Sequence, residues 1–346
     1  MSENRPILEV QNLSKYFPWG RGFFKHKGNL RAVDDVSFHV NEGETVALVG
    51  ESGCGKSTTG RLILQLENPT AGSVLFNKTP LNELTEEEFR TYRQDVQVVF
   101  QDTHGSLNPR KTLRQILTTA LVTSGKMKGA SKTDLLSRAG EILEDVGLTP
   151  ANRYLDRYPH QLSGGQRQRV CIARALVTEP KLIVADEPVS ALDVSVRAQV
   201  LKLLKKLQEE QNMAYIFISH DLAVVRSIAH WVCVMYLGKI VEYGPVETVF
   251  AERLHPYTEA LFSATPIPDP RETRGRERII LKGNVPSPSN PPNGCTFHTR
   301  CFYARDICKR ELPPSVQIAD DYFVTCHFAE ERNRGGMVGD RGTSAR

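Results

Sequence analysis

A glycine-rich segment between an apolar strand pattern and a helical pattern constrains this chain more than any other feature. The segment reads Gly50-Glu-Ser-Gly-Cys-Gly-Lys-Ser57 and fits the pattern G-x-x-x-x-G-K-[ST]. The run 45–50 predicts a buried strand, and 56–66 predicts the helix that follows it. Glycines let successive backbone N–H groups point toward one anion, and the helix N-terminus adds partial positive charge. The segment therefore predicts a phosphate-binding loop in an α/β domain.

Several side chains of this segment have the chemistry that a bound triphosphate requires. Lys56 can reach the β- and γ-phosphates, and the Ser57 hydroxyl can bind Mg²⁺. The simplest role for Cys54 is that of a small side chain pointing away from the phosphates. A cysteine at a helix N-terminus can instead have a depressed pKa, so alkylation of Cys54 that ATP prevents is a second hypothesis. The expected nucleotide-binding residues of this segment are Gly50, Ser52, Gly53, Cys54, Gly55, Lys56, Ser57 and Thr58.

Two adjacent acidic residues follow another buried strand further along the chain. The run Lys181-Leu-Ile-Val-Ala-Asp-Glu187 places Asp186 and Glu187 at the C-terminal end of a strand, where open α/β sheets bind ligands. Asp186 can complete the ligands of Mg²⁺, and Glu187 can polarise an attacking water as a general base. Such a pair is weak evidence alone, but together with the phosphate loop it predicts phosphoryl-transfer chemistry.

The chain changes character twice along its length. Alternating apolar runs and helical patterns predict βαβ units and a mostly parallel sheet up to about residue 250. Helical periodicity replaces them over 107–170, where Ser131 and Asp134 predict a helix start and Gly147 a helix end. Prolines and the charged run 271–278 predict a solvated linker. The predicted domains are a core over 1–106 and 171–265, a helical subdomain over 107–170, a C-terminal extension over 266–330 and a disordered tail over 331–346.

Composition and charge exclude several classes of protein. The chain is 40% hydrophobic, so it can bury a core. Its 44 Lys and Arg against 40 Asp and Glu give a net charge of +4, too small and too evenly mixed to predict nucleic-acid binding. No apolar run approaches the ~20 residues of a membrane span. The N-terminus lacks the pattern of a signal peptide. The chain is therefore expected in the cytosol unless a partner holds it at a membrane.

The helical region carries a motif that identifies a family. Leu162-Ser-Gly-Gly-Gln166 precedes a predicted helix, which makes a second helix N-terminus suited to an anion. Gln101 follows the strand pattern 96–100, and His220 ends the strand pattern 214–219. Each element is weak alone, but their order and spacing resemble the ATP-binding-cassette (ABC) ATPases over nearly the whole chain. The resemblance implies an α/β phosphate-loop ATPase with a RecA-like core and a helical subdomain.

The same resemblance implies how two copies of such a domain would share ATP. It implies a head-to-tail dimer with two ATP molecules between the cassettes. Gln101 would contact Mg²⁺ or the attacking water, and His220 would contact the γ-phosphate. Since no key position is degenerate, the site containing Glu187 is expected to hydrolyse ATP. The residues implied on one nucleotide are Lys56, Ser57, Gln101, Asp186, Glu187 and His220, and those implied on the partner's nucleotide are Ser163, Gly164, Gly165 and Gln166.

ABC ATPases also stack an aromatic side chain near the N-terminus on adenine. Phe17 aligns best with that position, and Tyr16 is the alternative. Either ring could instead be an ordinary core aromatic. The inserted segment 18–31 follows directly.

Four of the seven cysteines gather near the C-terminus. Cys295, Cys301, Cys308 and Cys326 are separated by five, six and seventeen residues. These gaps exceed the ~2–4 residues usual for the first pair of a zinc site. Four thiolates are the usual ligands of a [4Fe–4S] cluster. His298 and His327 keep zinc possible, and free thiols remain a third possibility.

The region around these cysteines resembles the C-terminal extension of dipeptide and oligopeptide importer ATPases. The similar stretches are 253–266, 285–292, Gly294-Cys295 and Arg300-Cys301. The resemblance implies a [4Fe–4S] cluster that holds a proline-rich tail. It also implies an ATPase subunit on the cytoplasmic face of the inner membrane, with two membrane-spanning permease subunits, a second related ATPase chain and an extracytoplasmic peptide-binding protein. An importer of nickel or another solute, and a soluble ABC ATPase of translation or DNA repair, are the alternatives.

Overall fold

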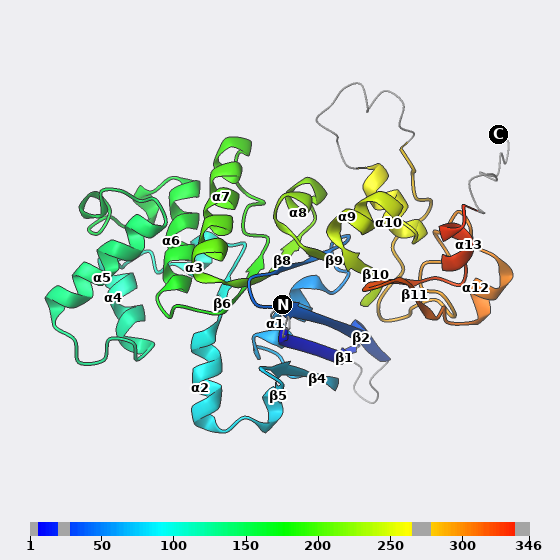
Figure 1. Ribbon diagram of the computed structural model, residues 1–346, viewed down its shortest axis with the longest axis horizontal. Coiled ribbons are helices and arrows are strands. Elements are labelled where there is room, and N and C mark those ends of the chain that lie inside the picture. Colours follow the sequence, from blue (N-terminus) through cyan, green and yellow to red (C-terminus); the bar gives the residue numbers. More distant parts are fainter. Residues whose placement is uncertain (1–5, 20–27, 265–277, 336–346) are drawn as a thin grey trace. The chain divides into compact units, whose positions relative to one another are not determined.

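The computed structural model describes residues 6–19, 28–264 and 278–335 (Figure 1). The chain divides into two compact units. Unit 1 comprises residues 1–8, 40–45 and 75–218, and unit 2 comprises 9–39, 46–74 and 219–346. Both units are built from several separate stretches of the chain.

Unit 1 contains three neighbouring parallel strands. β7 (Leu182–Asp186) lies between β6 (Val96–Val99) and β8 (Ala214–Ser219). Every residue of β8 and the first four of β7 are buried. Strands buried on both faces have continuous apolar sequences, which is why the sequence predicted them without alternation. These strand predictions are confirmed, with β6 ending one residue before Phe100.

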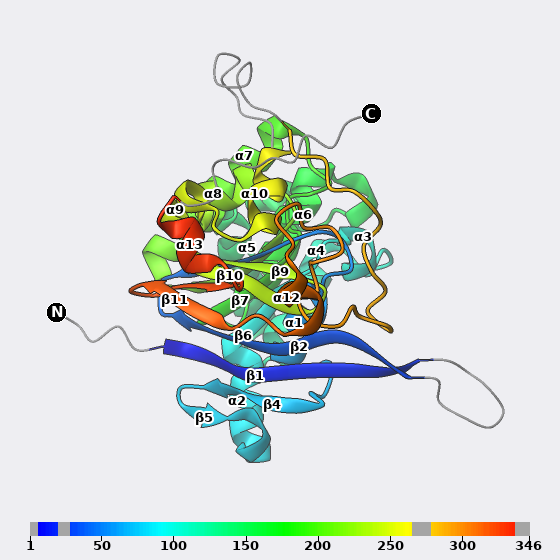
Figure 2. The same cartoon turned by 90° about the vertical axis from the view of Figure 1, so that its right-hand side faces the viewer.

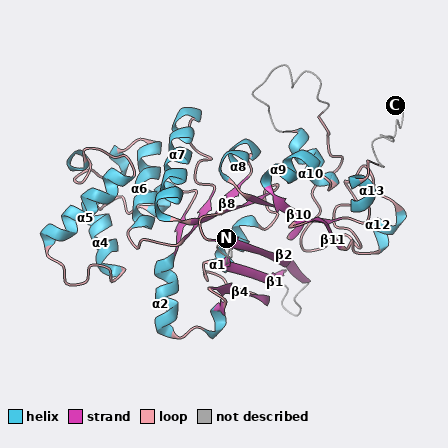
Figure 3. Cartoon of the chain, viewed as in Figure 1, coloured by secondary structure: helices cyan, strands magenta, loops and turns pink. Residues whose placement is uncertain are grey.

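The remainder of unit 1 is largely helical, and Figure 3 shows no strand between α4 and α6. In α5 (Lys132–Asp145) the buried side chains Ala139, Ile142 and Leu143 form one stripe. The Ser131 side chain accepts the N–H of Asp134 at the helix start, as predicted. The other elements of unit 1 are β5 (Thr79–Pro80), η1 (Leu81–Glu83), α2 (Glu86–Asp95), α3 (Thr103–Ser106), α4 (Leu113–Thr123), η2 (Ala151–Arg153), η3 (Pro159–Gln161), α6 (Gly164–Leu176) and α7 (Val194–Gln211).

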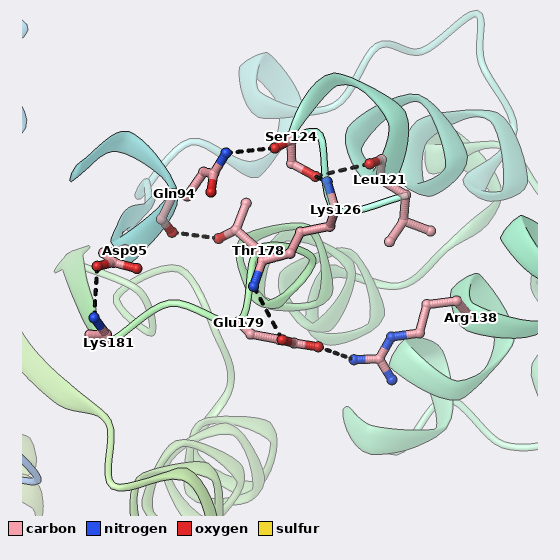
Figure 4. Close-up of polar contacts among 9 residues, drawn as sticks. All are labelled: Gln94, Asp95, Leu121, Ser124, Lys126, Arg138, Thr178, Glu179 and Lys181. Atoms are coloured by element: carbon pink, nitrogen blue, oxygen red, sulfur yellow. Dashed lines mark hydrogen bonds and ion pairs between the residues drawn. The ribbon is translucent and has the colours of Figure 1, made fainter. Parts of the chain in front are cut away.

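The turn between α6 and β7 connects the helices of unit 1 with its sheet (Figure 4). Glu179 forms ion pairs with Lys126 at 3.3 Å and with Arg138 of α5 at 3.1 Å. Two residues later, Lys181 pairs with Asp95 at the end of α2 at 2.9 Å. Since these side chains are partly exposed, each pair contributes only ~0–1 kcal/mol. The ion pairs of this turn therefore orient the helices relative to the strands of unit 1 but add little to the stability of the fold.

Unit 2 contains a mixed sheet. β3 (Thr45–Val49) runs parallel to β9 (Trp231–Tyr236), and β10 (Lys239–Pro245) pairs antiparallel with β9. β12 (Tyr322–Thr325) pairs with β10, and β11 (Ser315–Ala319) pairs with β12. The sequence analysis did not predict the last two strands. The C-terminal extension therefore adds strands to a sheet that also contains β3.

A further sheet in unit 2 contains the long strands β1 (Pro6–Trp19) and β2 (Gly28–Asn41), which lie side by side in Figure 2. β1 also neighbours β4 (Ala71–Phe76). The sequence analysis predicted no such sheet. Among the described residues, the helices of unit 2 are α1 (Lys56–Ile63), α8 (Leu222–Ile228), α9 (Val246–Glu252), α10 (Pro256–Ser263), α12 (Asp306–Arg310) and α13 (Ala329–Asn333).

A buried carboxylate joins β12 to the rest of unit 2. Glu242 of β10 is fully buried and accepts the Tyr322 hydroxyl at 2.5 Å. It also accepts the backbone N–H groups of Leu254 and His255 at 3.0 and 2.9 Å. Burial raises the pKa of Glu242. Three donors from two segments therefore converge on one buried acceptor, as a buried polar group requires.

The predicted disordered tail begins too early. Residues 329–333 form α13, where Arg332 pairs with Glu259 at 2.7 Å and donates through Nε to the Leu254 carbonyl at 2.6 Å. Residues 336–346 lie outside the described residues, as do 271–277 of the predicted linker and 20–27 of the inserted segment. Within the part of the chain that the structure describes, no helix combines the length and apolar character needed to cross a membrane.

Candidate functional site

The predicted phosphate loop follows β3 and opens α1, as the sequence analysis expected. Gly50, Gly53 and Gly55 have φ of 149°, 79° and 112°, conformations that favour glycine. A Cβ on Gly50 would collide with the Met235 carbonyl, and one on Gly55 would collide with the Ala32 carbonyl. Both neighbours are backbone atoms and cannot move aside cheaply. The glycines are thus required by close packing as well as by the turn.

Lys56 lies folded back over this loop. Its side chain is only 6% exposed, and its Nζ donates to the carbonyls of Gly50 at 2.7 Å and Glu51 at 3.0 Å. Ser57 and Thr58 follow in the first turn of α1 and are half-buried. The lysine charge and the N-terminus of α1 are therefore gathered around one loop, an arrangement suited to an anionic ligand.

Cys54 is packed beneath the loop. Its side chain is 4% exposed, and its Sγ accepts from Lys56 Nζ at 3.6 Å. Burial raises the pKa of the Cys54 thiol despite the nearby lysine. The depressed pKa of the second hypothesis is therefore absent at Cys54, because desolvation of the charged form outweighs the lysine charge and the helix N-terminus. Alkylation that ATP prevents stays a prediction.

The acidic pair lies in unit 1, where Asp186 is the last residue of β7. Glu187 follows with φ of 49°, and its backbone N–H donates to the Ile218 carbonyl of β8 at 3.0 Å. Gln101 Nε2 donates to the Glu187 carboxylate at 3.0 Å and lies 3.4 Å from the Ser190 hydroxyl. Residues in unusual backbone conformations cluster at functional sites. The structure thus brings together Gln101 and Glu187, which the sequence separates by 86 positions.

The motif 162–166 forms the start of α6 in unit 1. The exposed Ser163 caps the helix by accepting the N–H of Gln166 at 3.3 Å, while the Gln166 side chain accepts the N–H of Ser163 at 3.0 Å. A Cβ on Gly165 would collide with Val196 of α7, whereas Gly164 has more room beside Leu192. Part of this motif therefore serves helix packing, and the capped helix start remains at the surface.

The remaining predicted site residues lie in unit 2. His220 is exposed and precedes α8, whose N-terminus is capped by Asp221. The Tyr16 hydroxyl donates to Asp34 at 2.6 Å. Phe17 is half-buried, with the Lys15 ammonium 4.8 Å from the centre of its ring. Tyr16 is therefore held by a structural hydrogen bond, and Phe17 is the aromatic without such an anchor.

The four C-terminal cysteines line one small cavity in unit 2. Phe297, His298, Tyr303 and Arg332 are among the other residues that line it. Burial raises the pKa of Cys295 to about 11 and that of Cys301 to about 12. The ring nitrogens of His298 and His327 contact the backbone carbonyls of Cys295 and Glu311 at 2.8 and 3.0 Å. Among the described residues, no group of three or more His, Cys, Asp or Glu side chains is arranged as ligands around a metal ion.

Three residues around the phosphate loop were not predicted from the sequence. The Glu51 N–H donates to the Tyr257 hydroxyl at 2.8 Å, and the Glu51 carboxylate pairs with Arg300 at 2.8 Å. Tyr257 and Arg300 lie more than 200 positions away in the sequence. No local pattern marks them.

Comparison with known proteins identifies the family. Residues 33–190 match the model described as "ABC transporter", and 241–308 match "Oligopeptide/dipeptide transporter, C-terminal region". The dimeric ATP-binding cassette MJ0796 bound to ADP and Pi superposes with a TM-score of 0.60 at 32% identity, covering 69% of this chain and 98% of that one. The chain belongs to the ABC ATPases, and the predicted ABC fold is confirmed.

Two relatives indicate where in this family the chain belongs. The oligopeptide transport ATP-binding protein AppF of Bacillus subtilis is 50% identical over 324 residues, covering 93% of this chain and 97% of AppF. The dipeptide transport ATP-binding protein DppF of Escherichia coli is 45% identical over 327 residues, covering 94% and 96%. Within the ABC ATPases, the chain falls among the ATP-binding subunits of peptide transporters, as its resemblance predicted.

Proposed function

We propose that this chain is the ATP-hydrolysing subunit of an importer for dipeptides or oligopeptides. The observation that carries the proposal is the similarity to peptide-transport ATP-binding proteins over more than nine-tenths of both chains. The phosphate loop, the acidic pair and the capped motif at α6 are the parts that such an ATPase needs. The predicted function as a peptide-importer ATPase agrees with these relatives.

The phosphate loop and its neighbours would bind MgATP. Backbone N–H groups of the loop and the Lys56 ammonium would hold the phosphates, since the ammonium already lies over the loop and α1 begins there. Ser57, Asp186 and Gln101 would hold Mg²⁺, which neutralises the negative charge that develops on the phosphates. Phe17 would stack on adenine, because it aligns best with the aromatic position of the family, and the alternative Tyr16 is hydrogen-bonded to Asp34.

Glu187 would act as the general base. Its carboxylate accepts a hydrogen bond from Gln101 at 3.0 Å, which fixes its orientation. A carboxylate so oriented can take a proton from a water that attacks the γ-phosphate. His220 would contact that phosphate, and the helix start at 163–166 would contact the nucleotide of a second cassette. The second cassette would complete the site with groups this chain does not supply to its own nucleotide.

The assembly would contain several chains. A second, related ATPase chain would form the head-to-tail dimer, and two membrane-spanning permease subunits would provide the path for the peptide. An extracytoplasmic binding protein would deliver it. This chain would sit peripherally on the cytoplasmic face of the inner membrane through its contacts with the permeases. Closure of the dimer on ATP would drive rearrangement of the permeases, and hydrolysis would reopen it.

Cys295, Cys301, Cys308 and Cys326 would bind a [4Fe–4S] cluster. The fit is supported by four thiols that line one cavity. Four thiolates are the usual ligand set of such a cluster. When bound, the cluster would cross-link three short segments through its iron–sulfur bonds, namely the segments that carry Cys295 and Cys301, Cys308, and Cys326. The Cys295 N–H already donates to the Cys308 carbonyl at 2.8 Å, so two of these segments are adjacent without it.

Replacement of Glu187 tests the catalytic assignment. The Glu187→Gln variant should lose ATP turnover by about 10²–10⁴-fold, because the amide cannot accept the water's proton. It should still bind MgATP. Glu209→Gln, on the exposed side of α7, is the matched control and should turn over ATP like wild type. Steady-state phosphate release from the assembled transporter measures this, and wild-type turnover by Glu187→Gln would show that the base lies elsewhere.

Uptake measurements test the transported solute. A strain lacking this chain should lose uptake of a labelled dipeptide and regain it with the wild-type chain but not with Glu187→Gln. Uptake of labelled nickel should be the same in all three strains. Loss of nickel uptake with intact dipeptide uptake would contradict the peptide assignment.

Metal analysis tests the cluster. Anaerobically purified chain should contain iron and acid-labile sulfide and should absorb in the visible range of [4Fe–4S] clusters. Cys326→Ala should lose both signals because only three thiolates remain. Cys171→Ala, at a buried cysteine of α6 in unit 1, should keep them. Bound zinc, or no metal, in the wild-type chain would contradict the proposal.

A further inference from the structure

An arginine of the four-cysteine segment holds the second residue of the phosphate loop. Arg300 Nη1 and Nη2 donate to the two carboxylate oxygens of Glu51 at 2.8 and 3.2 Å. The Arg300 side chain is 8% exposed and that of Glu51 is 32% exposed. Two parallel hydrogen bonds between a guanidinium and a carboxylate fix both position and orientation. The pair is therefore a directional and partly buried link between segments 249 positions apart.

The backbone around Arg300 is itself fixed. The N–H groups of Arg300 and Cys301 both donate to the Phe297 carbonyl at 3.0 Å, so one tight turn carries the guanidinium and a cysteine of the cavity. The Phe297 ring packs 5.1 Å from Tyr236 and 5.5 Å from Tyr257. Arg300 and Cys301 are therefore held by the same turn.

The loop end of the link is connected to the expected phosphate ligand. Tyr257 accepts the Glu51 N–H at 2.8 Å, so Glu51 is held through its main chain as well as its side chain. The Glu51 carbonyl in turn accepts from Lys56 Nζ at 3.0 Å. The position of Glu51 therefore sets the backbone that Lys56 contacts and the direction of the first N–H groups of the loop.

We propose that Arg300 is a positioning residue for nucleotide binding, which transmits the order of the four-cysteine segment to the phosphate loop through Glu51. The inference rests on the proposed ATPase function and goes beyond a purely local role for the cysteines. Order in the segment raises nucleotide affinity, because a fixed loop loses less conformational freedom on binding. By thermodynamic linkage, bound nucleotide stabilises the segment by the same factor.

Replacement of Arg300 tests the link. In the full chain, Arg300→Gln should raise the Kd for a fluorescent ATP analogue with Mg²⁺ about tenfold, a loss of ~1.4 kcal/mol of binding free energy. KM for ATP should rise while kcat changes less, because Arg300 does not touch the reacting atoms. Arg305→Gln is the matched control, since Arg305 makes an equivalent fork to Glu331 at 2.8 and 3.1 Å without contacting the loop. It should leave the Kd unchanged.

Two further variants separate positioning from folding. Glu51→Gln should also weaken nucleotide binding. In the Glu51→Gln background, the further loss of affinity caused by Arg300→Gln should be smaller than the loss that Arg300→Gln causes in the wild-type chain. Cys326→Ala should weaken binding in the wild-type background but add little to Arg300→Gln. If Arg300→Gln proves insoluble, Glu51→Gln alone decides the question.

Specific results would overturn the inference. Wild-type affinity in Arg300→Gln or in Glu51→Gln would do so, as would an equal loss in Arg305→Gln or strict additivity in the double variant. Absence of nucleotide binding by the wild-type chain is a different result, and it would overturn the proposed function itself.

Discussion

The conformation of the phosphate loop is the constraint on which the rest of the structure depends. Gly50 and Gly55 adopt positive φ and press against the carbonyls of Met235 and Ala32, so the loop has little room for an alternative path. A loop that its own packing holds in place before the ligand arrives loses less conformational freedom on binding. The same packing excludes Cys54 from solvent and raises its pKa. The tight packing of the loop therefore both fixes its backbone and raises the pKa of the Cys54 thiol.

The C-terminal extension belongs to the unit that carries this loop. β12 pairs with β10, and the buried carboxylate of Glu242 accepts donors from β12 and from the turn before α10. Arg300 then reaches the loop from the same extension. An extension attached in this way is a structural support for the nucleotide site.

Local features were predictable from the sequence, and contacts between distant segments were not. Buried strands such as β8 have continuous apolar sequences, and the cap at Ser163 depends on residues three apart, so each is visible in a short window. β11 alternates exposed and partly buried residues, a pattern that is typical of a strand but was overlooked in a stretch of only five residues. The pair between Glu51 and Arg300 depends on topology alone. The burial of Cys54 agrees with the simplest role predicted for it, whereas the raised pKa of its thiol depends on burial that a short stretch of sequence does not show.

Amide hydrogen exchange of the full chain tests the central claim most directly, namely that the backbone of the phosphate loop binds the triphosphate. Peptides covering 50–58 should exchange more slowly when Mg²⁺ and a non-hydrolysable ATP analogue are added at saturation, because phosphate oxygens would accept the N–H groups. Peptides from the exposed helix α2 should exchange at the same rate with and without the analogue. Unchanged exchange in the loop at saturation would contradict the account.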